Sequence, residues 1–156
     1  MDPSRSPQRL AAVDRLLAER ACERLLVELV HRLDLGEPAD AAELFTPDGE
    51  WEWPAGERRV AGREALRACF GGRPTDRLSR RLVTNVRIDV HGPDAARGTS
   101  YLTTFRVDGH RGEPLPPGPP VQVGHYGDTF ERRDGAWRLA HRTRYLAFAG
   151  PTPKRR

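Results

Sequence analysis

The 156-residue chain carries 26 basic and 22 acidic residues, and its formal net charge is +4. Three of the basic residues are the last three of the chain, and without them 23 basic residues face 22 acidic ones. Arginine accounts for 25 of the 26 basic residues and is spread along the whole sequence. A nucleic-acid-binding protein would instead concentrate its basic residues on one face, so we expect no nucleic-acid partner.

The length suits one domain with a real hydrophobic core, and three Trp, three Tyr and five Phe support such a core. The N-terminal stretch MDPSRSPQR has no apolar region of the kind found in signal peptides. No apolar run approaches the roughly 20 residues that a membrane-spanning helix needs. Cys22 and Cys69 form no CxxC motif, which is typical of reduced thiols. We expect a soluble, cytoplasmic protein without membrane contact.

The first half of the chain has the apolar spacing of helices. Apolar residues recur at steps of three and four from Leu10 to Leu33, which predicts one long amphipathic helix that ends near Asp34, with Gly36 as its stop. Two shorter helices are predicted at Pro38–Phe45 and Arg63–Phe70. Between them, TPDG (46–49) is a turn signal, and EWEW (50–53) alternates as a strand does, with both tryptophans on one face.

The second half alternates with the period of two that is typical of strands. The predicted strands are Leu82–Val90, Gly98–Val107, Val121–Glu131 and Trp137–Phe148, with a Pro/Gly loop at 108–120 and an Asp-Gly hairpin turn before the last strand. Helices followed by consecutive antiparallel strands predict an α+β domain over residues 8–149, in which the helices cover one face of a curved antiparallel sheet and leave a pocket. Residues 1–7 and 150–156 are predicted to be flexible tails.

Three segments carry a family resemblance in the right order and spacing: HRLDLGEPADAAELFTPDGEWEWP, RRLVTNVRI and GHYGDTFERRDGAWRLAHR. Together they resemble the SnoaL-like branch of the NTF2-like superfamily, over about residues 8–148. That branch includes scytalone dehydratase, hexachlorocyclohexane dehydrochlorinase and small polyketide cyclases. The resemblance implies a cone-shaped fold around the long helix, a homodimer or homotrimer, and no cofactor. For function it implies only a range of activities, because this fold hosts enzymes and plain ligand binders.

The resemblance also implies a catalytic pair, and this sequence departs from it. In the dehydratase-like members a carboxylate at the end of the first helix orients a histidine at the start of the first long strand, and this histidine removes a proton. The matching positions here are Asp34 and Arg81. Arginine keeps its proton at any usable pH, so Arg81 cannot be the base. We expect a salt bridge that either only locks helix to sheet or lets Arg81 stabilise an oxyanion.

Alternation along the last two predicted strands offers a replacement base. One strand places Tyr126 and Asp128 on one face, and its partner places His141 and Tyr145 on one face. If both faces point inward, Asp128 and His141 approach each other in the pocket, where a histidine beside a carboxylate can move a proton. The alternatives are a structural hydrogen-bonding role for Asp128 and a half-buried histidine without chemistry.

The aromatic residues predict the pocket wall, and no motif predicts a metal. We expect the substrate to contact Trp51, Trp53, Tyr101, Tyr126 and Tyr145. The sequence has no HExxH motif, no paired Cys/His ligand set and no glycine-rich phosphate loop, so we predict neither metal nor cofactor.

Two functions remain open from the sequence. The first is a cofactor-independent lyase, isomerase or cyclase that acts on an oxygenated, largely apolar small molecule in secondary-metabolite biosynthesis. In it Asp34 orients Arg81, Arg81 stabilises the oxyanion, and His141 or Asp128 moves the proton. The second is a non-catalytic protein of the same fold that binds a hydrophobic ligand or serves in assembly.

Overall fold

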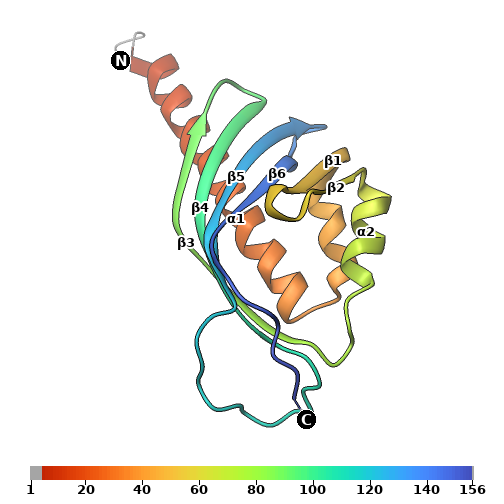
Figure 1. Cartoon of the computed structure of the whole chain (residues 1–156). Coiled ribbons are helices and arrows are strands. Elements are labelled where there is room, and N and C mark those ends of the chain that lie inside the picture. Colours follow the sequence, from red (N-terminus) through yellow and green to blue (C-terminus); the bar gives the residue numbers. More distant parts are fainter. Residues whose placement is uncertain (1–4, 156) are drawn as a thin grey trace.

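The computed structural model describes residues 5–155, in which helices cover one face of a curved sheet (Figure 1). The helices are α1 (Arg5–Asp34), the 3₁₀ helices η1 (Pro38–Leu44) and η2 (Pro54–Gly56), and α2 (Arg63–Gly71). The strands are β1 (Phe45–Trp53), β2 (Arg58–Ala61), β3 (Leu78–Val90), β4 (Ala95–Val107), β5 (Gln122–Arg133) and β6 (Ala136–Ala149). Within the described chain they form one six-stranded sheet in the order β2-β1-β6-β5-β4-β3. The predicted α+β class is confirmed.

The long helix follows the predicted apolar spacing. Cys22, Leu26, Leu29 and Leu33 are buried against the sheet, one or two positions per turn. The helix ends where the amides of Leu35 and Gly36 both donate to the carbonyl of His31, at 2.8 and 3.1 Å. The helix begins at Arg5, so residues 5–7 of the predicted tail belong to it. Residues 1–4 of that tail lie outside the described residues.

The structure differs from the predictions around the first strand. TPDG does not form a turn between elements but lies inside β1, which is irregular between Phe45 and Glu50. The four-residue strand β2 was not predicted, because RRVA is too short to show a period. β1 pairs antiparallel with β2 but parallel with β6, so the sheet is mixed rather than antiparallel as predicted.

The four long strands form the antiparallel part of the sheet, and the turn between the last two follows a local rule. The β5–β6 hairpin turns at Asp134 and Gly135, whose φ angles of 52° and 77° suit an Asp-Gly pair, as predicted. β3 begins at Leu78, four residues before its predicted start, and is interrupted by a bulge between Thr84 and Arg87.

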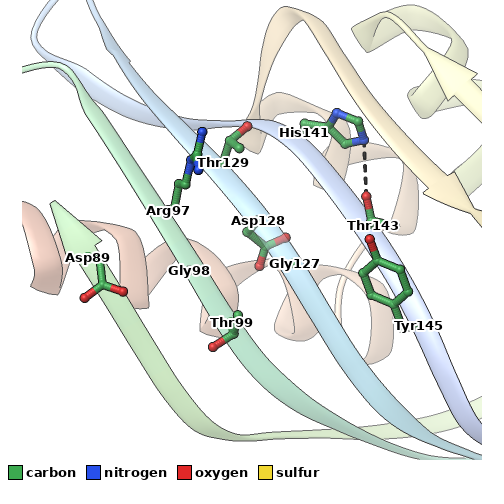
Figure 2. A pocket seen from close by; sticks show the side chains of 10 residues that line it. All are labelled: Asp89, Arg97, Gly98, Thr99, Gly127, Asp128, Thr129, His141, Thr143 and Tyr145. Atoms are coloured by element: carbon green, nitrogen blue, oxygen red, sulfur yellow. Dashed lines mark hydrogen bonds between the residues drawn. The ribbon is translucent and has the colours of Figure 1, made fainter. Parts of the chain in front are cut away.

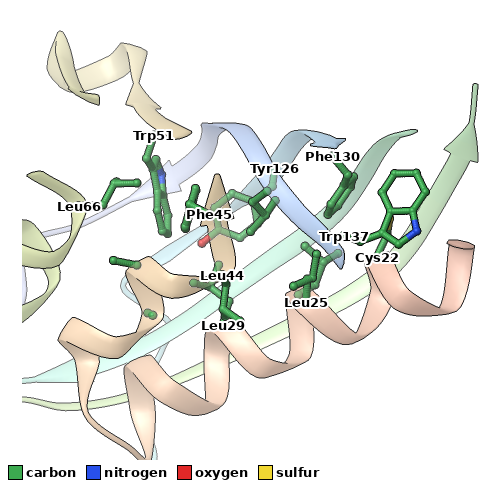
Figure 3. Close-up of a cluster of buried hydrophobic side chains, with 14 of the residues drawn as sticks. Cys22, Leu25, Leu29, Leu44, Phe45, Trp51, Leu66, Tyr126, Phe130 and Trp137 are labelled. Carbon is green, nitrogen blue, oxygen red and sulfur yellow. The ribbon is translucent and has the colours of Figure 1, made fainter. Parts of the chain in front are cut away.

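The hydrophobic core lies between α1, α2 and the inner face of the sheet (Figure 3). The sheet contributes large apolar side chains such as Phe45, Trp51, Tyr126 and Phe130, all of them buried. We call the opposite side of the sheet the outer face. It is not covered by any of the described helices and carries exposed aromatic side chains such as Tyr101.

The C-terminal segment contacts the loop after β4. The Asp108 amide donates to the Pro153 carbonyl at 3.1 Å, and the Arg155 amide donates to the Asp108 carbonyl at 3.0 Å. Arg106 Nε donates to the Thr152 hydroxyl at 2.9 Å. The part of the predicted tail that the structure describes therefore lies along the base of the sheet. None of the described helices is long and apolar enough to cross a membrane.

Candidate functional site

The end of α1 meets the start of β3 through the predicted salt bridge. The Arg81 amide donates to Asp34 Oδ2 at 2.7 Å, and Arg81 Nη1 pairs with the other oxygen of the same carboxylate. The two side chains are only 7% and 3% exposed. Both carboxylate oxygens of Asp34 are therefore engaged by Arg81, one through the backbone and one through the guanidinium.

A second buried ion pair lies deeper on the inner face. Arg142 Nε and Nη2 donate to the two oxygens of Asp128 at 2.7 and 2.8 Å. The guanidinium also lies 3.8 Å from the centre of the Tyr126 ring. Burial by itself lowers the pKa of Arg142, but the Asp128 carboxylate outweighs it, so the net direction is upward. This pair is the bidentate arrangement that a guanidinium and a carboxylate prefer.

The prediction that His141 approaches Asp128 is wrong. The register pairs Phe130 with Leu139 but Thr129 with His141, so Ala140 is an extra residue in β6. This bulge reverses the alternation, and Arg142 takes the inward position that unbroken alternation gives to His141. The side chain of His141 instead lies on the outer face, with Nε2 3.5 Å from Glu52 Oε2 and 3.3 Å from the Thr143 hydroxyl.

His141 belongs to a group of possible metal ligands on that outer face. Ligand atoms of Glu50, Glu52 and His141 lie within 4.8 Å of one another. However, Arg59 donates to both oxygens of Glu50, at 2.5 and 3.0 Å. The guanidinium thus already engages both oxygens of one of the three possible ligands.

The five predicted wall residues are divided between the two faces. Trp51, Trp53 and Tyr126 lie together on the inner side: the two indoles stack at 5.2 Å, and Tyr126 meets Trp51 edge-on at 5.9 Å. Tyr101 and Tyr145 are 58% and 46% exposed on the outer face, so their predicted place in the interior is wrong. For Tyr145 the cause is again the bulge in β6.

A groove of about 360 Å³ crosses the outer face (Figure 2). Its lining includes Asp89, Arg97, Thr129, His141 and Tyr145. Figure 2 shows His141 joined to Thr143 by a hydrogen bond, on the strand next to the one that carries Asp128. This groove is open, and it does not contain the Asp34–Arg81 pair.

Sequence reasoning missed the arginines that surround Arg81. Three half-buried arginines and one at their rim come from β2, β4, β6 and the segment after α2. They are Arg58, Arg73, Arg106 and Arg144. Alternation along the strand could have placed Arg106 on the same face as Leu102 and Thr104. The bulge in β6 makes the same rule assign Arg144 to the wrong face. In a sequence this rich in arginine, composition singles out none of them.

These arginines interact with one another. Burial, followed by the charge of Arg81, lowers the pKa of Arg73 to about 10. Burial also lowers the pKa of Arg144, and Arg81 and Arg58 lower it further. The pKa of Arg106 is lowered by burial and then by Arg77, Arg81 and Arg144. The interior around Arg81 is therefore a region of concentrated positive charge, suited to holding an anion rather than to accepting a proton.

The comparisons with known proteins agree with this fold. Residues 14–143 match the family of SnoaL-like domains. An NTF2-like protein with a cystatin-like fold from Novosphingobium aromaticivorans is 24% identical, with a TM-score of 0.72, and the match covers 90% of this chain and 89% of that one. A scytalone dehydratase-like protein from the same species is also 24% identical, with a TM-score of 0.69 and coverage of 87% and 88%.

A hexachlorocyclohexane dehydrochlorinase, LinA-type3 from Novosphingobium barchaimii, is 20% identical, with a TM-score of 0.68 and coverage of 90% and 93%. The search of curated proteins gave no match. Identities this low establish a shared fold and no shared reaction. Because the family match covers most of the chain, and the fold agrees, this chain belongs to the family of SnoaL-like domains.

Proposed function

We propose that this chain binds a small organic molecule against the inner face of its sheet and does not carry out the proton abstraction of the dehydratase-like relatives. One observation supports the proposal most directly. The buried carboxylates of Asp34, at the end of α1, and of Asp128, on the inner face of β5, each have both oxygens engaged by an arginine.

A general base must reach the proton that it removes, and a guanidinium held on both oxygens of a carboxylate stabilises the deprotonated form and competes with that proton. The oxygens of Asp34 face Arg81, and those of Asp128 face Arg142. His141, the remaining candidate, lies on the outer face beside Glu52. The proposed site keeps a flat apolar surface, the half-buried ring of Trp53 stacked on Trp51, with the guanidiniums of Arg58 and Arg144 next to it.

The second candidate is a cofactor-independent lyase, isomerase or cyclase, as in the relatives that are named for such reactions. The observation in its favour is the group of arginines around Arg81, since fixed cations can stabilise an oxyanion that develops during a reaction. In this case Arg81 would hold the oxyanion, and the proton would leave to solvent.

Proton exchange distinguishes the two candidates without knowledge of the natural ligand. Two aromatic ketones serve as probes, 2-tetralone and a derivative that carries a carboxylate on its ring. Saturation-transfer NMR measures binding, and loss of the C–H signal next to the carbonyl in D₂O measures proton abstraction. We expect at least one probe to bind and neither to exchange faster than in buffer alone.

Arg81→His restores the residue type of the relatives and is the positive control for the geometry. We expect it to accelerate exchange of a bound probe, while Arg87→His, at an exposed position on the outer face of β3, does not. Acceleration by the wild-type protein supports the lyase, isomerase or cyclase instead. Failure of both probes to bind contradicts the proposal.

A further inference from the structure

We propose that the interior arginines form a binding site for an organic oxyanion, a carboxylate or phosphate group attached to an aromatic body. The arginine cluster consists of Arg73, Arg81, Arg106 and Arg144, with Arg58 at its rim. This inference rests on the proposed function and names the class of ligand that the same site takes.

The charges of the cluster are not balanced by the protein. Asp34 neutralises Arg81, but the other four guanidiniums have no carboxylate within salt-bridge distance among residues 5–155. Three of them have only neutral partners: Arg58 donates to Cys69 Sγ at 3.1 Å, Arg106 to the Thr152 hydroxyl at 2.9 Å, and Arg144 to Gln122 Oε1 at 3.0 Å. In addition, the buried Nε of Arg144 has no acceptor.

Several exposed arginines of the same chain do have carboxylate partners. Arg59 pairs with Glu50, Arg133 with Asp48, and Arg20 with Glu23, although water could solvate each of these cations. Thus some arginines have carboxylate partners where these contribute little to stability, whereas the half-buried Arg73, Arg106 and Arg144 have none among residues 5–155. A group of half-buried cations without carboxylate partners is the arrangement expected of a site whose counter-ion is a ligand.

The cations converge on one place although they come from separate parts of the chain. β3 pairs Arg81 with Thr104, two residues before Arg106 on β4, and the guanidiniums of Arg58 and Arg144 approach the same Trp53 ring. The charge of Arg81 also lowers the pKa of Arg73, Arg106 and Arg144. Arg58 acts on Arg144 in the same way. An anion bound among them would offset this repulsion and supply acceptors for planar guanidinium donors, which match carboxylate and phosphate oxygens in pairs.

Aromatic rings set the second property of the ligand. The guanidiniums of Arg58 and Arg144 lie 5.1 and 5.8 Å from the centre of the Trp53 ring, and Arg73 lies 5.6 Å from that of Phe70. Trp53 is itself half-buried and stacked on Trp51. The cations thus lie over aromatic rings, so positive charge and apolar surface meet at one place, which favours an anion that carries a planar body over a free inorganic ion.

Isothermal titration calorimetry on the full chain tests this with matched probes. The probes are 2-naphthoate, 2-naphthyl phosphate and the neutral 2-naphthamide, which has nearly the shape of the carboxylate. We expect the tighter of the two anions to bind at least about tenfold more strongly than the amide, since hydrogen bonds between charged groups are stronger than neutral ones. Which anion binds more tightly identifies the group that the site prefers.

Two variants locate the binding in the cluster. Arg73→Gln and Arg144→Gln should each weaken the preferred anion about tenfold and leave the amide unchanged. The control Arg87→Gln removes an exposed arginine from the outer face of β3 and should change neither. If either cluster variant does not fold, the wild-type protein still provides a test, because raised NaCl should weaken the anion and not the amide.

Three results would overturn the inference. The first is equal affinity of 2-naphthamide and the two anions, which contradicts an anion site but still agrees with the proposed binding of a small organic molecule. The second is no binding of either anion at millimolar concentration. The third is an affinity for the anions that survives both cluster variants.

Discussion

Arg142, and not His141, lies directly opposite Asp128 in the pairing of β5 with β6, and its guanidinium binds both oxygens of that carboxylate at 2.7 and 2.8 Å. The extra residue Ala140 causes this, because one bulge exchanges the faces of all residues after it. As a result, His141 lies outside the interior, and the guanidinium of Arg142 is a buried cation there.

Loss of this cation should destabilise the fold. Arg142→Met leaves the Asp128 carboxylate buried without a partner, and we expect a loss of about 3–5 kcal/mol in the free energy of unfolding, measured with urea. His141→Gln, one residue away but on the outer face, should change it by less than about 0.5 kcal/mol. Equal losses in the two variants would contradict the assignment of the faces.

The pair between α1 and β3 should also couple the two elements. We expect Arg81→Met to lower the free energy of unfolding by about 3 kcal/mol, because Asp34 then remains buried without its counter-ion. In the double variant with Asp34→Asn the loss should be smaller than the sum of the two single losses. Urea denaturation of the four proteins in this cycle measures the coupling, and strictly additive losses would show that the two side chains do not interact.

The two cysteines should differ in reactivity. Burial, followed by the charge of Glu23, raises the pKa of Cys22 to about 12, so its thiol stays protonated at pH 8. Cys69 is half-buried and contacts Arg58. In the folded protein we expect a thiol-specific disulfide reagent to modify one cysteine rapidly, and peptide mass spectrometry to identify it as Cys69. Modification of Cys22 at a comparable rate would contradict the burial of α1 on the sheet.

Acid should weaken the attachment of the loop after β4. A bidentate hydrogen bond from Arg77, with its charge, lowers the pKa of Asp108 below its unfolded value. The stabilisation is therefore complete above about pH 4 and is lost as the pH falls through the lower, folded-state pKa. In Asp108→Asn the melting temperature should fall less steeply than in the wild type as the pH is lowered. Asp14→Asn, at an exposed position of α1, should show the same steep fall as the wild type.

Much of the fold could be predicted because its signals are local. The helix ending at Asp34 has a clear apolar period and a stop at Gly36, and the Asp-Gly pair at 134–135 specifies its hairpin. The position of Arg81 opposite Asp34 followed from the family resemblance and is confirmed. By contrast, β2 is four residues long, and the parallel pairing of β1 with β6 joins segments nearly a hundred residues apart, so neither leaves a local pattern.

The interior was predicted less well for a physical reason. Side-chain alternation assigns faces only while a strand is regular, and Ala140 carries no signal that distinguishes a bulge from an ordinary strand residue. The error therefore affected His141, Tyr145 and Arg144 together. In a chain with 25 arginines, the half-buried ones that lack carboxylate partners become visible only when the structure shows which side chains are buried and which are paired.

The most direct test of the account is to follow the arginine side chains while an anion binds. NMR of the ¹⁵N-labelled protein resolves the Nε–H signals, which can be assigned from the Arg73→Gln, Arg144→Gln and Arg97→Gln variants. On titration with 2-naphthoate, we expect the signals of Arg73 and Arg144 to shift, and that of Arg97, in the groove of the outer face, to stay in place. A saturable shift at Arg97 with unchanged signals for Arg73 and Arg144 would place the ligand on the outer face and contradict an interior anion site.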